Sequence, residues 1–191
     1  MRLHLDKPGL RVLGVAESFR PDRRWSVLAG VVMRGDLVVD GLVLGRASVG
    51  GDDATASIAS LYRRLRRNDV NVLMVSGCIL SLYNILDVDG LARKTKLPVV
   101  CLTYKETAGI EDAIARHFPD RVDEKLAAYR RLGGRKRVLL RSGHAVFVRT
   151  SGLAEEKARA VIDMFTLQGS VPEPVRVARL LARATASARK G

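Results

Sequence analysis

Aromatic residues are scarce in this sequence, and it contains no long hydrophobic run. Phe, Trp and Tyr make up only 5% of the 191 residues, although 47% are hydrophobic, so the core is expected to be mostly aliphatic. No apolar run approaches the roughly 18 residues that cross a bilayer. The N-terminus, Met1–Pro8, lacks the apolar stretch of a signal peptide. We therefore expect a cytoplasmic protein with no membrane partner.

Cysteine is also rare. The two cysteines, Cys78 and Cys101, both lie in apolar segments, and buried cysteines of non-secreted proteins are usually free thiols. We therefore expect two reduced core thiols rather than a disulfide or a metal pair. The histidines, His4, His117 and His144, are scattered along the sequence and form no metal-ligand set with the cysteines.

Acidic residues are fewer than basic residues in this sequence. The chain has 33 Lys and Arg against 20 Asp and Glu, which gives a formal net charge of +13. A field of this sign attracts phosphate polyanions through counterion release. Arg-rich surfaces also occur in proteins from hot environments, but Glu usually balances the charge there. The charge therefore favours nucleic-acid binding and argues against a protein-interaction module without a nucleic-acid role.

Three segments concentrate the basic residues and are candidates for binding nucleic acid. They are Arg63, Arg64, Arg66 and Arg67; Arg130, Arg131, Arg135, Lys136 and Arg137; and Arg176, Arg179 and Arg183. The dipole of a predicted helix partly explains the first cluster. The second surrounds a Gly pair, so it is either a loop that follows a phosphate backbone or a solvated loop. The spacing of the third makes one basic stripe along a helix.

Few aromatic residues are available for base stacking. Phe19 and Tyr83 lie beside the motifs described below, while Trp25 and Tyr104 lie on other predicted strands. We expect a core role for all four. The alternative for Phe19 is a wedge against an extruded base.

Hydrophobic periodicity divides the chain into a first third of strands and an alternating remainder. Residues 11–15, 25–33 and 37–49 are predicted strands joined by short connections, which predicts an antiparallel meander. Further strands are predicted at 71–75, 97–102 and 146–148, and helices at 53–67, 87–95, 110–118, 123–132, 153–167 and from Pro174 onwards. Strand–helix–strand units of this length specify parallel crossovers. The sequence therefore predicts one α/β domain, residues 1–191, with a mixed sheet and helices on both faces.

Several motifs keep the order and approximate spacing found in one protein family. They are Arg11–Phe19; Gly30–Gly35 with Asp40-Gly41; Gly51–Thr55; Asn84–Asp87 followed by Leu97–Val100; and Val171–Ala178, which contains Pro-Glu-Pro-x-Arg-x-Ala. Together they resemble the endonuclease dU family, which is related to endonuclease V and has an RNase H-like fold. The resemblance covers nearly the whole chain.

The resemblance implies a function and a cofactor. The family is mostly archaeal and is associated with cutting DNA near deaminated bases such as deoxyuridine, while endonuclease V cuts beside deoxyinosine. The implied chemistry is metal-assisted phosphodiester hydrolysis in DNA repair. Carboxylates from the first strand, a neighbouring loop and the central strand would hold Mg²⁺ or Mn²⁺, which activates water and stabilises the leaving oxygen.

This chain departs from the family pattern at its metal ligands. The Asp of the first strand is replaced by Ala16 and the Asp at the end of the central strand by Ser76. Leu153 stands where endonuclease V often has a His. A methyl group has no ligand atom, and a hydroxyl is a poor substitute for a carboxylate. Because two anionic ligands are lost, metal binding should be severely weakened.

The acidic residues that remain nearby are Glu17, Asp52, Asp53 and Asp87. A rearranged metal site would use the first three for catalysis and Asp87 as a further ligand. However, Glu17 follows Ala16, and neighbours on a regular strand point to opposite faces. One of Asp52 and Asp53 is expected to cap the next helix, and capping is the alternative for Asp87.

Three hypotheses therefore remain. The chain is a working endonuclease with a rearranged site, a degenerate relative that binds nucleic acid without cutting, or a protein-interaction module. DNA is the expected partner in the first two.

Overall fold

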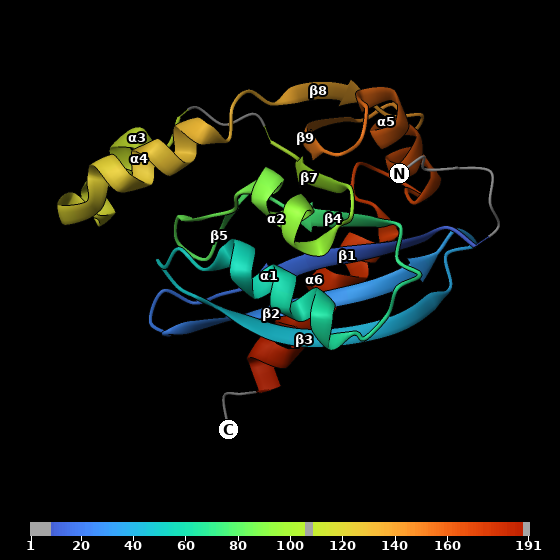
Figure 1. Cartoon of the computed structure of the whole chain (residues 1–191), viewed down its shortest axis with the longest axis horizontal. Coiled ribbons are helices and arrows are strands. Elements are labelled where there is room, and N and C mark those ends of the chain that lie inside the picture. The colour runs from blue at the N-terminus through green and yellow to red at the C-terminus, as the bar shows by residue number, and fades with distance from the viewer. Residues whose placement is uncertain (1–8, 106–108, 189–191) are drawn as a thin grey trace.

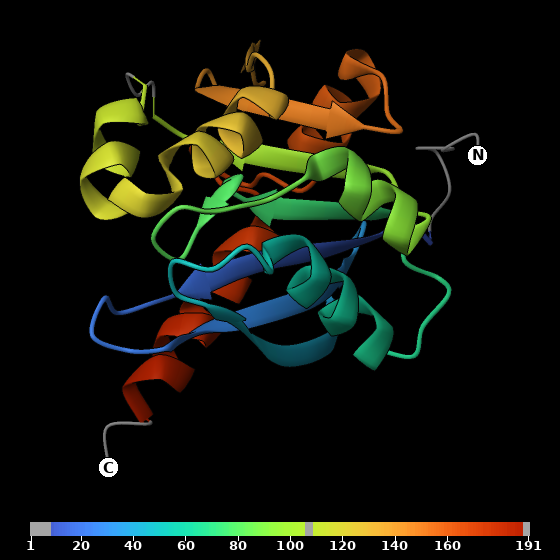
Figure 2. The same cartoon turned by 60° about the vertical axis from the view of Figure 1, so that its left-hand side comes forward.

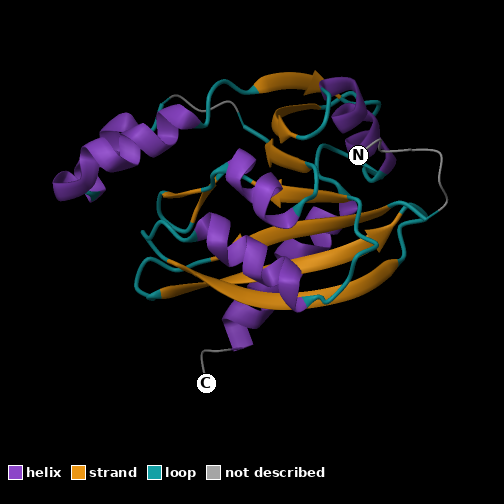
Figure 3. Ribbon diagram, in the orientation of Figure 1, coloured by secondary structure: helices purple, strands orange, loops and turns teal. Residues whose placement is uncertain are grey.

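A seven-stranded mixed sheet forms the centre of the computed structural model, which describes residues 9–105 and 109–188 (Figure 1, Figure 3). Its strands are β1 (Arg11–Ser18), β2 (Trp25–Arg34), β3 (Val39–Ser48), β4 (Val72–Ser76), β7 (Val99–Thr103), β8 (Lys136–Leu139) and β9 (Ala145–Ser151). They lie in the order β3-β2-β1-β4-β7-β9-β8. A separate hairpin pairs β5 (Ile79–Leu80) with β6 (Asn84–Ile85). The N-terminal stretch that includes His4 lies outside the described residues.

The strand pairing confirms the predicted mixed sheet. β1, β2 and β3 form the antiparallel meander, and β1, β4 and β7 run parallel. The pairs β7–β9 and β9–β8 are antiparallel. Because parallel strands end at the same edge, the carboxyl ends of β1, β4 and β7 lie side by side.

Helices cover both faces of the sheet. They are α1 (Ala54–Arg64), α2 (Val88–Thr95), α3 (Glu111–His117), α4 (Val122–Arg131), α5 (Glu155–Met164) and α6 (Glu173–Ala188), with a 3₁₀ helix, Pro119–Arg121, before α4. In Figure 1, α1 and α2 lie in front of the sheet and α6 lies behind it. Figure 2 also shows that α3 and α4 extend beyond the end of the sheet.

The alternation of side chains along β1 divides the core between the two faces. Leu13 and Val15 pack in the cluster that contains Ile58 of α1. Val12 belongs to the opposite cluster, which contains Val175 of α6. Apart from two cysteines, two methionines and the ring of Phe165, the buried residues of both clusters are aliphatic, as the composition predicts.

Gly14 on β1 determines how closely α6 packs on the sheet. A Cβ at this position would lie 2.3 Å from the carbonyl carbon of Pro174 and 2.7 Å from the nitrogen of Val175. Any side chain would therefore push the first turn of α6 outward. This contact places the rest of α6 against β1 and β2.

The predicted elements are confirmed in type and order, with their ends shifted by a few residues, but the sequence failed to indicate β8. Lys136 and Arg137, which we assigned to a basic loop, belong to this edge strand, in which Val138 pairs with Val146. Only Val138 is buried in β8, so the strand lacks the apolar alternation on which the prediction depended.

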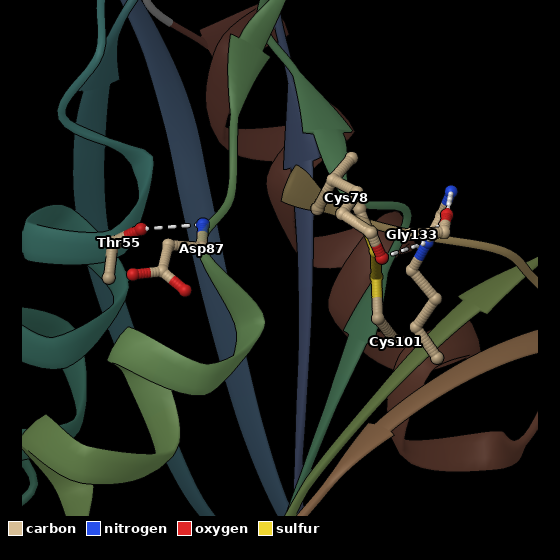
Figure 4. The surroundings of a disulfide bond; sticks show 7 residues. Thr55, Cys78, Asp87, Cys101 and Gly133 are labelled. Atoms are coloured by element: carbon tan, nitrogen blue, oxygen red, sulfur yellow. Dashed lines mark hydrogen bonds between the residues drawn. A yellow bond between two sulfur atoms is a disulfide. The ribbon is translucent and has the colours of Figure 1, made fainter. Parts of the chain in front are cut away.

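The expectation of reduced thiols was wrong. Cys78 and Cys101 form a disulfide, with Cα atoms 6.1 Å apart (Figure 4). Their apolar neighbours correctly indicated burial, since both residues are at most 2% exposed. The sequence could not show, however, that the turn after β4 returns Cys78 to β7, where Cys101 lies.

None of the helices in the two described ranges has the length and apolar composition needed to span a membrane.

Candidate nucleic-acid interface at the carboxyl edge of the sheet

Ala16 and Ser76 are neighbours at the carboxyl edge of the sheet. Val15 pairs with Val75 in the parallel β1–β4 ladder. Ala16 and Ser76, the next residues of the two strands, therefore both point to one face of the sheet. That face is covered by α6, because Ala16 packs against Ala178. In open α/β sheets, ligands bind outside the carboxyl ends of the strands. The two departures from the family pattern therefore occupy one site.

Arg179 of α6 occupies this site. Its Nε and Nη2 atoms donate hydrogen bonds to the Ser76 hydroxyl at 3.0 and 2.7 Å. Its guanidinium also lies over the ring of Tyr104, 4.5 Å from the ring centre. Tyr104 directly follows β7, so side chains from three neighbouring elements meet here. Among the described residues, no carboxylate forms a salt bridge with Arg179.

The hydroxyl of Tyr104 is buried and has no hydrogen-bond partner in the described part of the chain. Burial raises the pKa of Tyr104 to about 12, although the charge of Arg179 opposes the rise. The phenol is therefore protonated at neutral pH and is a potential donor.

Glu17 points away from this site. Its carboxylate accepts a hydrogen bond from the main-chain nitrogen of Ser81 at 2.6 Å and another from the Ser81 hydroxyl. Burial raises the pKa of Glu17, and the hydrogen bonds from Ser81 only partly offset the rise. Ser81, Leu82 and Tyr83 all have positive φ angles, so Glu17 helps to hold a strained turn.

Asp52 is engaged by two cations of the 3₁₀ helix and α4. Its carboxylate pairs with Arg121 and, at 2.7 Å, with Nζ of Lys125. Partial burial raises the pKa of Asp52, but the hydrogen bonds from Lys125 and Arg121 outweigh burial and hold it below the usual value. Lys125 is fully buried and also donates to the carbonyl oxygens of Gly50, Gly51 and Tyr83.

Asp53 occupies the N-cap position of α1 but makes no side-chain hydrogen bond to its main chain. The expectation that Asp52 or Asp53 caps this helix is therefore wrong. Instead, the Asp53 carboxylate accepts from Asn84 Nδ2 at 2.6 Å and from the nitrogen and hydroxyl of Ser48. Partial burial raises its pKa, but these hydrogen bonds, Asn84 foremost, hold it below the usual value. The Ser57 hydroxyl of α1 also donates to this carboxylate, so the partners of Asp53 are Ser48, Asn84 and Ser57 and not the main-chain nitrogens of the helix.

Asp87 caps α2, as the alternative reading of the sequence predicts. Its Oδ1 accepts from the nitrogen of Gly90 at 2.8 Å. Its own main-chain nitrogen donates to Thr55 Oγ1 at 2.9 Å, as Figure 4 shows. The side chain thus has a structural role at the start of the helix.

The donor set at the carboxyl edge does not fit a divalent cation. Mg²⁺ and Mn²⁺ require oxygen ligands, usually with at least one carboxylate. The groups that meet at this edge are the methyl of Ala16, the hydroxyl of Ser76 and the positively charged guanidinium of Arg179. Among residues 9–105 and 109–188, no group of three or more His, Cys, Asp or Glu side chains is arranged to hold a metal ion.

The third basic cluster extends from this site along α6. Arg176, Arg179 and Arg183 line a surface trough with a volume of about 810 Å³, which also contains His144. Arg176 pairs with Glu173 at 2.9 Å. Arg183 is exposed and has no partner among the described side chains. The trough is thus positively charged on the side formed by α6.

The other two clusters lie elsewhere. Arg67 is held by Asp40 and Asp69, at 2.8 and 2.7 Å, and Arg63 is exposed on α1, which packs on the face opposite α6. In the second cluster, Arg130, Arg131 and Arg137 are exposed, Lys136 pairs with Glu155 at 2.7 Å, and Arg135 lies 5.4 Å from the Phe147 ring centre. The structure does not place these clusters beside the stripe on α6.

Sequence reasoning missed three residues of functional interest. Ser76 was considered only as a lost metal ligand and Tyr104 only as a core residue, while Lys125 was not singled out. Apart from the apolar character around Tyr104, which predicted its burial, no local pattern marks these roles. The Arg179–Ser76 contact spans 103 positions in the sequence.

The sheet order and its helices define an RNase H-like α/β protein with the fold of endonuclease V. The chain belongs to the endonuclease dU family, whose model matches residues 8–186. A UPF0215 protein of Pyrobaculum calidifontis is 36% identical over 171 residues, which cover 89% of this chain and 93% of that protein.

Two solved structures show the same fold. A protein of unknown function from Archaeoglobus fulgidus matches with a TM-score of 0.77 and 26% identity, covering 92% of this chain and 98% of the other. Endonuclease V of Ciona intestinalis, in complex with an inosine-containing DNA, matches with a TM-score of 0.63 and 11% identity, covering 95% and 87%. Family and fold together support a nucleic-acid-processing role.

Proposed function

We propose that this protein binds DNA at deaminated bases along the α6 face without cutting it by metal-dependent hydrolysis. The observation that carries the proposal is the contact between Arg179 and Ser76. It places a guanidinium at the edge where the family pattern implies carboxylates. A cation at this place repels a metal ion and attracts phosphate.

The charge along α6 supports DNA as the ligand. Arg176 and Arg183 are seven residues apart, which corresponds to about 10 Å along a helix axis. This stripe can therefore contact more than one backbone phosphate. The net charge of +13 adds a long-range attraction to any polyanion. The Ciona endonuclease V, which has the same fold, is bound to DNA. The family name supports deoxyuridine as the lesion.

The alternative is a working endonuclease that uses Glu17, Asp52 and Asp53. Family membership favours it. Against it, each of these carboxylates already has hydrogen-bond partners within the fold, and Glu17 lies on the other face of β1 from Ala16. A protein-interaction module is the second alternative, which the charge of α6 disfavours.

The test compares cutting and binding on the same substrates. End-labelled duplexes with one deoxyuridine, one deoxyinosine or neither are incubated with the protein and Mg²⁺ or Mn²⁺. Fluorescence anisotropy measures binding of the same duplexes in EDTA at several salt concentrations. We expect binding in EDTA that favours the duplexes with a deaminated base and falls steeply with salt, and no nicking.

A triple variant on α6 and a control variant on the opposite face locate the interface. Replacing Arg176, Arg179 and Arg183 with Gln should reduce the slope of log K against log salt by up to about 2.7, because each lost phosphate contact accounts for about 0.9. Replacing Arg64, an exposed arginine on the opposite face, should leave the slope nearly unchanged. Metal-dependent nicking that disappears in Glu17→Gln would establish the working endonuclease. Absence of DNA binding at low salt would favour the interaction module.

A further inference from the structure

The most unusual side chain at the carboxyl edge is Arg179, a half-buried arginine without a carboxylate partner among the described residues. An arginine guanidinium has five N–H donors. Two of its nitrogens donate to the single hydroxyl oxygen of Ser76, and Nη1 makes no hydrogen bond to the described residues. A buried charge is normally paired, because its removal from water is costly. The fold therefore holds this cation in place while leaving part of its donor capacity unused.

Tyr104, whose ring contacts Arg179, carries a second group without a partner. The guanidinium lies against its ring, at 4.5 Å from the ring centre, and its hydroxyl is buried without a partner. An orphaned buried hydroxyl costs free energy unless a ligand or water satisfies it. A buried hydroxyl without a partner, beside a guanidinium whose remaining donors face the trough, indicates a place for an acceptor, and the charge of Arg179 indicates that this acceptor is an anion.

The position of Arg179 makes such an anion accessible. The residue lines the trough on α6 together with Arg176 and Arg183, so it is open to solvent on that side. The Ser76 hydroxyl fixes the guanidinium from the sheet side, and the Tyr104 ring limits its movement. A guanidinium held in this way is oriented before a ligand arrives, which reduces the entropy cost of binding.

We propose that Arg179, Ser76 and Tyr104 form a metal-independent phosphate site, in which Arg179 binds a phosphate group of the nucleic acid. This inference rests on the proposed DNA-binding function and names the group that the carboxyl edge recognises. Arg179 and the Tyr104 hydroxyl donate to phosphate oxygens, while the Ser76 hydroxyl orients the guanidinium. The positive charge that a metal would supply in a nuclease of this family comes from the protein itself.

The first experiment uses inorganic phosphate as the probe and does not require DNA. The ¹⁵N-labelled full chain is titrated with phosphate in EDTA, and the arginine Nε–H signals are followed by NMR. We expect a saturable shift of the Arg179 signal. Arg179→Gln should abolish saturable phosphate binding measured on the same sample by calorimetry, whereas Arg64→Gln should leave it unchanged. An undiminished phosphate affinity in Arg179→Gln would overturn the site.

Three further variants separate binding from folding. Tyr104→Phe removes a hydroxyl that has no partner, so the melting temperature should not fall, while phosphate affinity should fall roughly tenfold. Ser76→Asp should pair with Arg179 and block phosphate binding, and Ser76→Asn, of similar size but neutral, should not block it. Equal phosphate affinity of Ser76→Asp and Ser76→Asn would contradict the assignment, as would a Tyr104→Phe variant with undiminished affinity.

Binding measurements with DNA, compared with those with phosphate, distinguish this inference from the proposed function. If DNA binds but phosphate does not act through Arg179, the phosphate site is wrong and DNA binding stands. If phosphate binds at Arg179 but DNA does not bind, the site is an anion site unrelated to nucleic acid, and both proposals as stated fail. Stronger binding of 5′-phosphorylated than of unphosphorylated oligonucleotides would support a terminal phosphate as the ligand, and equal binding would support an internal phosphodiester.

Discussion

Replacing Lys125 with Met should destabilise the protein strongly, because this ammonium holds several segments together from inside the fold. Its Nζ atom contacts the carbonyl oxygens of Gly50, Gly51 and Tyr83 at 3.1, 2.6 and 3.1 Å and the Asp52 carboxylate at 2.7 Å. It also lies 4.8 Å from the centre of the Phe118 ring. Methionine fills a similar volume but leaves these oxygens without their donor.

The size of the effect follows from these contacts. Removing one partner of a buried ion pair costs roughly 3–5 kcal/mol, and each orphaned buried acceptor adds about 1–3 kcal/mol. The side chain of Asp52 is 45% exposed and regains water, so we take the lower end, about 3 kcal/mol. In a domain of this size, 1 kcal/mol lowers the melting temperature by roughly 2–4 °C. Lys125→Met should therefore melt about 6–12 °C below the wild type.

The assay is thermal denaturation followed by circular dichroism, with urea denaturation as an independent measure. Lys157→Met is the control, because Lys157 is exposed on α5 and its replacement should shift the melting temperature by less than about 1 °C. If Lys125→Met melts within about 2 °C of the wild type, the oxygens around the ammonium do not depend on it, and the reasoning is refuted.

Three further predictions concern Glu17, Gly14 and the aromatic residues of the β1–β2 turn. The pKa of Glu17 is raised above its ordinary value of 4.5. The contribution of this residue to stability is therefore present at a pH below that value and is lost as the pH rises through the folded-state pKa. The advantage of Glu17→Gln in melting temperature over the wild type should grow from about pH 4 to pH 7, and a difference in melting temperature that does not change with pH would contradict this. Gly14→Ala should lower stability by about 1–3 kcal/mol or more in urea denaturation, because the new Cβ would lie 2.3 Å from the Pro174 carbonyl carbon; an unchanged midpoint would show that α6 moves freely. Phe19 is 39% exposed, so the core role expected from the sequence is wrong for this residue. Phe19 and Trp25 line a cavity of about 320 Å³ with neighbouring arginines. Phe19→Ala should therefore weaken single-stranded DNA binding by about 1 kcal/mol in anisotropy and duplex binding less, whereas equal losses would argue against base stacking.

The fold was predictable where periodicity is strong and local. β2 is buried at eight consecutive positions, and β4 and β7 are short buried runs between turns, which left little ambiguity. β8 was not predictable from local pattern, because its pairing with β9 depends on residues such as Val148 that lie outside the strand itself. The disulfide escaped prediction for a related reason: burial can be inferred from apolar neighbours, but the proximity of two thiols depends on the whole path of the chain.

The sequence showed which metal ligands of the family are missing from the candidate site, but it did not show which side chains contact one another there. Strand alternation predicted that Glu17 points away from Ala16, in agreement with its contact to Ser81. The stripe on α6 was predicted from the spacing of its arginines. The sequence could not show that Arg179 reaches Ser76, because the two residues meet only when α6 packs on the face of β1 and β4 that carries Ala16 and Ser76.

These three positions are physically coupled. An Asp at position 16 or 76 would face Arg179 at short range in a partly buried place, where opposite charges attract strongly. The resulting salt bridge would occupy the guanidinium and leave nothing to bind phosphate. Conversely, Arg179 beside a pair of carboxylates would compete with a metal for the same oxygens. The neutral residues Ala16 and Ser76 are therefore as important to a phosphate site as the arginine, since the methyl group introduces no competing charge and the hydroxyl orients the guanidinium without neutralising it. The same edge of the same fold can thus bind a cation or an anion, depending on which side chains occupy these three positions.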